Sequence, residues 1–172
     1  MRFFVTLLLA IALTGCVSKY RLDSYAAPTS RIDRSASFYV PLPADGRYSA
    51  TTYAGSGTAT AQAVSNALLV HVKNVVIGTT AGEDLESAIE QAKQKNLTHV
   101  IRTTILNWED RATQWSGIPD KITLKFDIYE TQSGKEISSS MASASSKWAT
   151  FGGDHPQDLL PEPAKRFVDP LF

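Results

Sequence analysis

A run of strict alternation near residue 125 constrains the fold more than any other feature. Between Lys121 and Thr131 every second position is apolar, namely Ile122, Leu124, Phe126 and Ile128. Successive side chains of a strand point to opposite faces, so this period of two predicts a β-strand with one buried face. A turn is predicted over Gln132–Gly134, and Lys135–Trp148 is its antiparallel return strand. The chain therefore needs further elements that cover the apolar face of a hairpin.

The residues before this hairpin switch between strand and helix patterns. Short β-branched or apolar runs predict strands over Ser37–Leu42, Asn74–Gly78 and Thr98–Trp108. Apolar residues spaced three and four apart predict helices over Thr58–Val72, Thr80–Asn96 and a C-terminal segment from about Glu162. In the second of these strands three successive residues, Val75–Ile77, are apolar, which is typical of a strand in the middle of a sheet.

The order strand, helix, strand, helix, strand, strand, strand, helix predicts one α/β (α+β) domain. We expect a mixed sheet of about four to five strands, packed with about three helices. Right-handed crossovers would make the middle strands parallel. The order is similar to the small domain shared by the amino-terminal part of the Tol translocation protein B, the curli-secretion lipoprotein and the lipoprotein activators of penicillin-binding proteins. That likeness is one of architecture and carries little functional weight.

An export signal opens the chain and ends in its only cysteine, Cys16. Arg2 supplies a positive charge, and Phe3–Leu13 is an apolar stretch too short for the roughly twenty residues that cross a bilayer. Leu13–Cys16 resembles a bacterial lipobox, in which the cysteine is acylated and cleavage falls just before it. We therefore predict a signal peptide over residues 1–15 and a lipid on Cys16. A plain secretory signal is the alternative, but it would leave an unpaired thiol in an oxidising compartment.

The segment after the cysteine is polar and shows no helical or strand period. We predict a flexible tether over residues 16–37, with a reach of about 25 Å, and a domain over residues 38–172. The alternative is an irregular segment packed on the domain through Tyr20, Leu22 and Tyr25. Val17 stands where an aspartate would resemble an inner-membrane retention signal, which favours the periplasmic face of the outer membrane. The 17 basic and 17 acidic residues are interspersed, and this balance predicts no nucleic-acid partner.

The densest group of interaction-prone side chains lies in one predicted loop. Its candidate binding residues are Trp108, Glu109, Asp110, Arg111, Trp115 and Asp120. Loops on a rigid scaffold commonly carry binding sites, and tryptophan and arginine are favoured at interface hot spots. This pattern predicts a surface for an envelope protein or polymer. The alternative is structural, with an acid pairing Arg111 while the two tryptophans cover the sheet edge.

The sequence contains only weak signals for a catalytic, cofactor or metal site. The three histidines are scattered, and neither a G-x-S-x-G nor an H-E-x-x-H motif is present, so we expect no catalytic residue, cofactor or metal. A hydrolase site could still form if folding brought a carboxylate such as Glu109 to Asp154 or His155. The segment Gly55–Thr58 could bind an anion at a helix start, but it lacks a P-loop lysine, which favours a simple helix entry.

The same cluster also carries a family resemblance. With Lys121-Ile122, Ser146–Trp148 and Gly152–Pro156 after it, it resembles a family of uncharacterised proteobacterial lipoproteins known only as a domain of unknown function. The resemblance runs from about Phe38 to Phe172. It implies a lipoprotein with a single domain, and it transfers no catalytic residues.

These observations predict a membrane-anchored, periplasm-facing lipoprotein that acts as a non-enzymatic binding or accessory module of the cell envelope. An envelope hydrolase and a structural spacer lipoprotein without a specific ligand remain the alternatives. An exposed edge strand of the hairpin would also permit a homo-oligomer.

Overall fold

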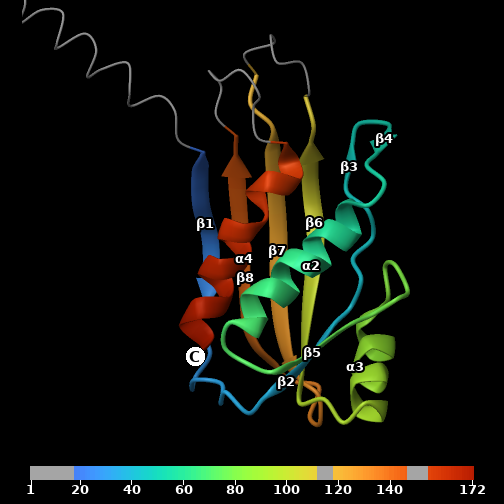
Figure 1. Ribbon diagram of the computed structural model, residues 1–172, viewed down its shortest axis with the longest axis vertical. Coiled ribbons are helices and arrows are strands. Elements are labelled where there is room, and N and C mark those ends of the chain that lie inside the picture. The colour runs from blue at the N-terminus through green and yellow to red at the C-terminus, as the bar shows by residue number, and fades with distance from the viewer. Residues whose placement is uncertain (1–17, 112–117, 147–154) are drawn as a thin grey trace, which may run out of the picture.

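The centre of the fold is a six-stranded mixed sheet (Figure 1). The computed structural model describes residues 18–111, 118–146 and 155–172. The strands of the sheet are β1 (Lys19–Ala26), β2 (Ser37–Val40), β5 (Asn74–Ile77), β6 (His99–Glu109), β7 (Lys121–Glu130) and β8 (Glu136–Ser145). A separate small hairpin joins β3 (Arg47–Tyr48) to β4 (Thr51–Thr52). The helices are α2 (Ser56–Leu69), α3 (Leu85–Gln94) and α4 (Pro161–Val168), with the 3-10 turns η1 (Pro156–Leu159) and η2 (Asp169–Leu171). Within the described ranges, no helix has the length and apolar character needed to cross a bilayer.

The strand order is β1-β8-β7-β6-β2-β5. Strand β2 runs parallel to both β5 and β6, while β6, β7, β8 and β1 pair antiparallel. The predicted α+β class, with parallel middle strands and an antiparallel hairpin, is confirmed. The predicted number of strands, four to five, is one or two too low.

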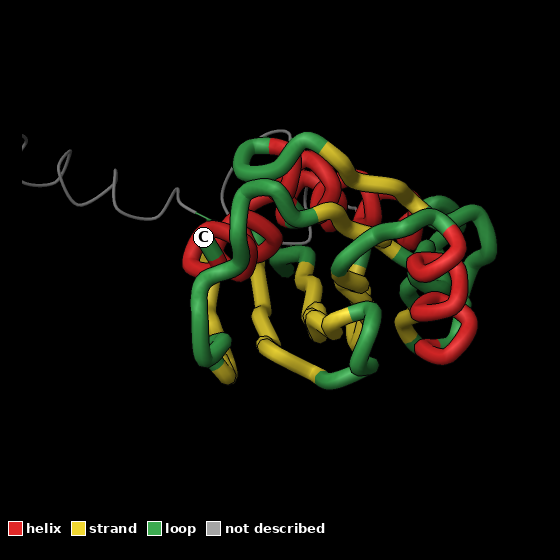
Figure 2. Tube along the Cα trace, turned by 90° about the horizontal axis from the view of Figure 1, so that it is seen from below, coloured by secondary structure: helices red, strands yellow, loops and turns green. Residues whose placement is uncertain are grey.

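Helices pack on both faces of the sheet. Helices α2 and α4 lie across one face, and α3 lies apart from them at the β2–β5 side (Figures 1 and 2). The main core lies under α2 and α4 and contains the four predicted inward residues of β7, Ile122, Leu124, Phe126 and Ile128. A second cluster packs α3 against the other face through Tyr39, Ala88, Val100 and Tyr129. Alternate side chains of β2 and β7 thus enter the two cores on opposite faces of the sheet. Tyr129 was predicted to face outward into solvent, but it is buried because α3 covers it.

Strand β1 corrects the predicted tether. Residues 16–37 were expected to be flexible, but Lys19–Ala26 pairs with β8 along its whole length and forms one edge of the sheet. Most of its side chains are exposed, so it lacks the regular apolar period that predicts a strand, although Tyr20 and Tyr25 pack against the main core. The ordered domain also starts before residue 38, because Ile32 is in the main core and its N–H donates to the carbonyl of Leu171 at 2.7 Å.

Strand β5 corrects a second expectation. Its apolar sequence predicted the middle of the sheet, whereas it lies at the edge opposite β1. The two flanking helix layers explain the pattern. Val75 packs on the main core and Val76 on the α3 cluster, so an edge strand here has apolar contacts on both faces.

Candidate functional site

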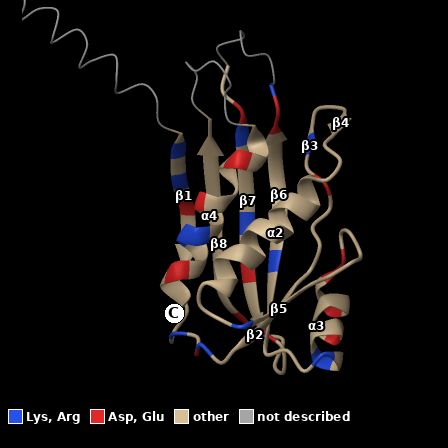
Figure 3. Cartoon of the chain, viewed as in Figure 1, with Lys and Arg blue, Asp and Glu red and all other residues tan. Residues whose placement is uncertain are grey.

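Four strands come together at one end of the sheet. Strands β6 and β8 end there, and β1 and β7 begin there (Figure 1). In register, Lys19 lies opposite Ser145, Ser145 opposite Lys121, and Lys121 opposite Glu109. We call this row the loop end of the sheet, together with the flanking residues Asp110, Arg111, Asp120, Ser146 and His155. Charges of both signs meet where β6 ends and β7 begins (Figure 3), and most of the predicted binding residues fall at this end.

Trp108 belongs to the core. Its side chain is only 3% exposed and packs in the main cluster. The backbone of Gly46 passes so close that a Cβ placed there would lie 2.7 Å from the Cβ of Trp108. Trp108 therefore packs the β3–β4 region onto β6, and its burial favours the structural alternative for this residue. Trp115, the other tryptophan predicted in this loop, lies outside the described residues.

Glu109 and Arg111 form an ion pair, as the structural alternative predicted. The Arg111 Nη2 lies 2.8 Å from the Glu109 Oε2, and the Asn107 amide donates to the other oxygen of Glu109 at 3.0 Å. Arg111 also donates to the hydroxyl of Tyr48 at 2.9 Å and lies 5.4 Å above its ring centre. The pair therefore ties the end of β6 to the β3–β4 hairpin.

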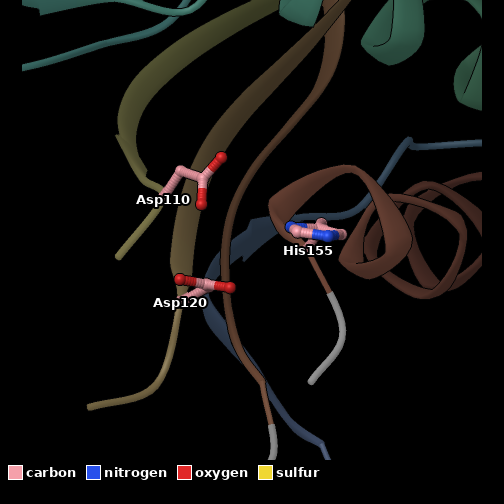
Figure 4. A group of neighbouring side chains, drawn as sticks. All are labelled: Asp110, Asp120 and His155. Atoms are coloured by element: carbon pink, nitrogen blue, oxygen red, sulfur yellow. The ribbon is translucent and has the colours of Figure 1, made fainter. Parts of the chain in front are cut away.

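Three other side chains come together beside this pair. Asp110 follows β6, Asp120 precedes β7, and His155 precedes η1, and one ligand atom of each lies within 4.8 Å of the other two. Figure 4 shows the three side chains approaching one another from three separate segments. We call them the Asp–Asp–His cluster. Asp110 and Asp120 were predicted as binding residues, but their association with His155 was not.

Asp120 is the most buried member of the cluster, with 8% of its surface exposed. The backbone N–H of Arg111 donates to its Oδ1 at 2.6 Å. Its own backbone accepts from the N–H of Ser146 at 2.9 Å, and its N–H donates to the Ser146 hydroxyl at 2.9 Å. These bonds hold the carboxylate in place at the point where β7 begins and β8 ends.

Burial raises the pKa of Asp120 above its usual range, and the charge of Asp110 raises it further. The hydrogen bond from Arg111 and the charges of His155 and Arg111 act in the opposite direction, but the net direction is upward. A buried acid beside a second acid and a histidine is an arrangement found at functional sites as well as in structural networks.

The hydrolase alternative needed a carboxylate brought by folding to His155 or Asp154. Asp110 and Asp120 do lie beside His155, whereas both oxygens of Glu109 are engaged by Arg111 and Asn107. Asp154 lies outside the described residues. The donors that do meet, two carboxylates and an imidazole, form a set able to bind a cation. No local motif reveals them, because Asp120 and His155 are far apart in sequence and meet only through the sheet.

The carboxylate of Asp45 binds the glycine-containing start of α2. Asp45 Oδ1 accepts from the N–H of Gly57 at 2.8 Å, and the Ser56 hydroxyl lies 3.3 Å from the same oxygen. A Cβ at Gly57 would lie 2.2 Å from the carbonyl oxygen of Pro43, so the glycine permits this close approach. A side-chain carboxylate thus occupies the place that an external anion would need, in keeping with the helix entry favoured from the sequence.

A family model described as a domain of unknown function, DUF4823, matches residues 30–171. The chain belongs to the DUF4823 family. This confirms the uncharacterised family expected from the sequence, and the match extends eight residues further toward the N-terminus than the resemblance from about Phe38. Comparison with curated proteins finds no match to this DUF4823 chain.

Solved structures similar to this DUF4823 chain include two of PelC from Paraburkholderia phytofirmans, described as dodecamers. One has a TM-score of 0.69 at 14% identity and covers 90% of this chain and 97% of PelC. The other, a variant, has a TM-score of 0.64 at 16% identity, with 89% and 98% covered. The lipoprotein GNA1162 from Neisseria meningitidis is more distant, with a TM-score of 0.45 at 18% identity and 63% and 81% covered. At these identities the PelC structures show a shared fold.

Proposed function

We propose that this DUF4823 chain is a lipid-anchored, non-enzymatic module of the bacterial cell envelope. Cys16 carries the lipid, the periplasmic face of the outer membrane is the destination, and the domain binds an envelope protein or polymer. One observation supports the anchored arrangement in particular. Strand β1 begins at Lys19, three residues after Cys16, and its first residue is part of the loop end.

The short connection sets the distance between domain and membrane. Three residues span at most about 10 Å, whereas the tether expected from the sequence reached about 25 Å. A lipid on Cys16 therefore holds the loop end close to the headgroups. Lys19 and Lys121 are exposed at this end and suit anionic lipids. Ile118, three residues before Lys121 in the chain, is an exposed apolar residue (48% of its surface). The opposite end of the sheet then points away from the membrane, toward partners.

A membrane-depth measurement tests this orientation. Acylation consumes the only native thiol, so Lys121→Cys creates a single labelling site at the loop end. Ser133→Cys is the matched variant, in the turn at the far end of β7. Strand β7 has ten residues, which separates the two labels by about 30 Å. In vesicles containing a headgroup quencher, fluorescence from position 121 is expected to be quenched strongly and fluorescence from position 133 little.

The same vesicles supply the control. A water-soluble quencher should reach both labels, which shows that each is accessible. Equal headgroup quenching at the two positions, or stronger quenching at 133, would contradict the proposed orientation without affecting lipidation itself.

Self-association is the second part of this proposal. The two sheet edges, β1 and β5, present unpaired backbone groups of the kind through which chains associate, and the similar PelC chain is described as a dodecamer. We expect the full chain in detergent to show a mass that is a multiple of its 18.7 kDa sequence mass, less the signal peptide. Light scattering coupled to size-exclusion chromatography measures it, with Leu22→Lys on β1 lowering the mass if that edge is the contact. A monomer mass at every concentration would refute self-association.

A further inference from the structure

We propose that the Asp–Asp–His cluster binds one divalent transition-metal ion, with zinc as the representative ion. Asp110, Asp120 and His155 each supply one ligand. The inference rests on the geometry of these three side chains and is independent of the lipid anchor and of any partner.

The distances fit such an ion. The ligand atoms lie within 4.8 Å of one another, and metal bonds of about 2.0–2.2 Å place ligand atoms within roughly 4.4 Å of each other. A small side-chain rotation therefore completes the set. The backbone of His155 is already held, because its N–H donates to Asp158 Oδ2 at 2.9 Å and its carbonyl accepts from the N–H of Asp158 at 2.9 Å. The imidazole itself lies on an exposed residue, where an ion can reach it.

The charges also favour a cation. Two carboxylates face each other, and Asp120 is more than nine-tenths buried. The Arg111 side chain is directed to Glu109 and Tyr48, so it does not stand between the two aspartates. One oxygen of Asp120 is oriented by the Arg111 N–H, and among the described residues no side chain donates a hydrogen bond to the other oxygen. A bound ion would supply the positive charge that these groups share.

The donor types select the class of ion. Imidazole favours zinc, nickel, copper and iron, whereas calcium and magnesium prefer sets made of oxygen alone. Three protein ligands leave a fourth position for water or for a ligand from a partner. Because the ligands belong to the end of β6, the start of β7 and the start of η1, the ion would join three segments at the loop end.

Metal binding is tested on the full, lipidated chain in detergent, with any affinity tag removed. Zinc chloride is titrated by isothermal calorimetry, and bound zinc is counted by mass spectrometry after dialysis. We expect one zinc per chain. His155→Ala and Asp110→Asn should each weaken binding about tenfold or more, a loss typical of altered metal sites, and calcium or magnesium should bind far more weakly than zinc.

Two further variants test whether the loss of zinc is specific to the cluster and independent of folding. Glu86→Gln changes an exposed acid on α3, far from the cluster, and should bind zinc as the wild type does. Asp120→Asn should lose zinc while circular dichroism remains native, because an amide oxygen can still accept from Arg111. His155 is exposed, so His155→Ala tests the site without a folding defect. The proposal is wrong if the wild type takes up no stoichiometric zinc, or if His155→Ala binds zinc as tightly as the wild type.

Discussion

Replacing Cys16 by serine is expected to remove the protein from the outer-membrane fraction. Serine cannot form the thioether that carries the diacylglycerol, and each buried methylene of an acyl chain contributes about 0.8 kcal/mol to membrane attachment. Loss of two or more chains therefore abolishes stable anchoring. Fractionation of cells by density gradient measures the location, and mass spectrometry of the N-terminus shows whether residues 1–15 have been removed and Cys16 acylated.

A variant at the next position is the matched control. Val17→Asp keeps the acylated cysteine but introduces the residue that resembles an inner-membrane retention signal. It is expected to stay lipidated and to move to the inner membrane. If the Cys16→Ser protein still fractionates with the outer membrane, or if the native chain carries no lipid, the anchoring proposal fails whatever the behaviour of the zinc site.

Trp108→Ala is expected to lower the free energy of unfolding by about 3–5 kcal/mol, the usual cost of truncating a buried tryptophan to alanine. Trp108 is almost fully buried in the main core, and Gly46 packs directly against its Cβ, so the surrounding backbone can close the cavity only in part. Against a total stability of about 5–15 kcal/mol for a typical domain, such a loss is severe. Urea unfolding of the full chain in detergent, followed by circular dichroism, measures it.

Ile118→Ala provides the comparison within the same part of the chain. Its side chain is 48% exposed, so its change should stay within about 0.5 kcal/mol, as for most surface substitutions. If Trp108→Ala instead unfolds at the same urea concentration as the wild type and only partner capture is lost, Trp108 would be a binding residue after all. That result would reverse the assignment made from its burial.

The parts of the fold that were predictable have strong local signals. The predicted alternation of β7 is confirmed for all four inward residues. Apolar side chains at a period of two lie on one face of a strand, so burying that face fixes the register. The predicted helices overlap α2, α3 and α4, although the second was expected to begin at Thr80 and begins at Leu85. Asn96, the last residue of the second predicted helix, has φ 54°, the left-handed conformation common just after a helix.

The errors occur where neighbours in space override the local pattern. Strand β1 has mostly polar, exposed side chains, and its pairing comes from the backbone of β8. Strand β5 is apolar because two helices flank it, although it lies at a sheet edge. Within the predicted loop, Trp108 enters the main core while Asp110 and Asp120 lie at the loop end of the sheet, a division that composition alone does not reveal.

Local sequence patterns were enough to predict the lipid anchor, the α+β class and the core face of the hairpin, because each depends on residues close together in the chain. The tertiary structure was needed to show that the sheet already begins at Lys19, that Glu109 pairs with Arg111, and that His155 meets Asp110 and Asp120. These features depend on the register between strands, which brings together residues that are distant in sequence and have no shared motif. Strand β1 thus replaces most of the expected tether, and the ends of β6 and β7, with the residue before η1, bring the Asp–Asp–His cluster together.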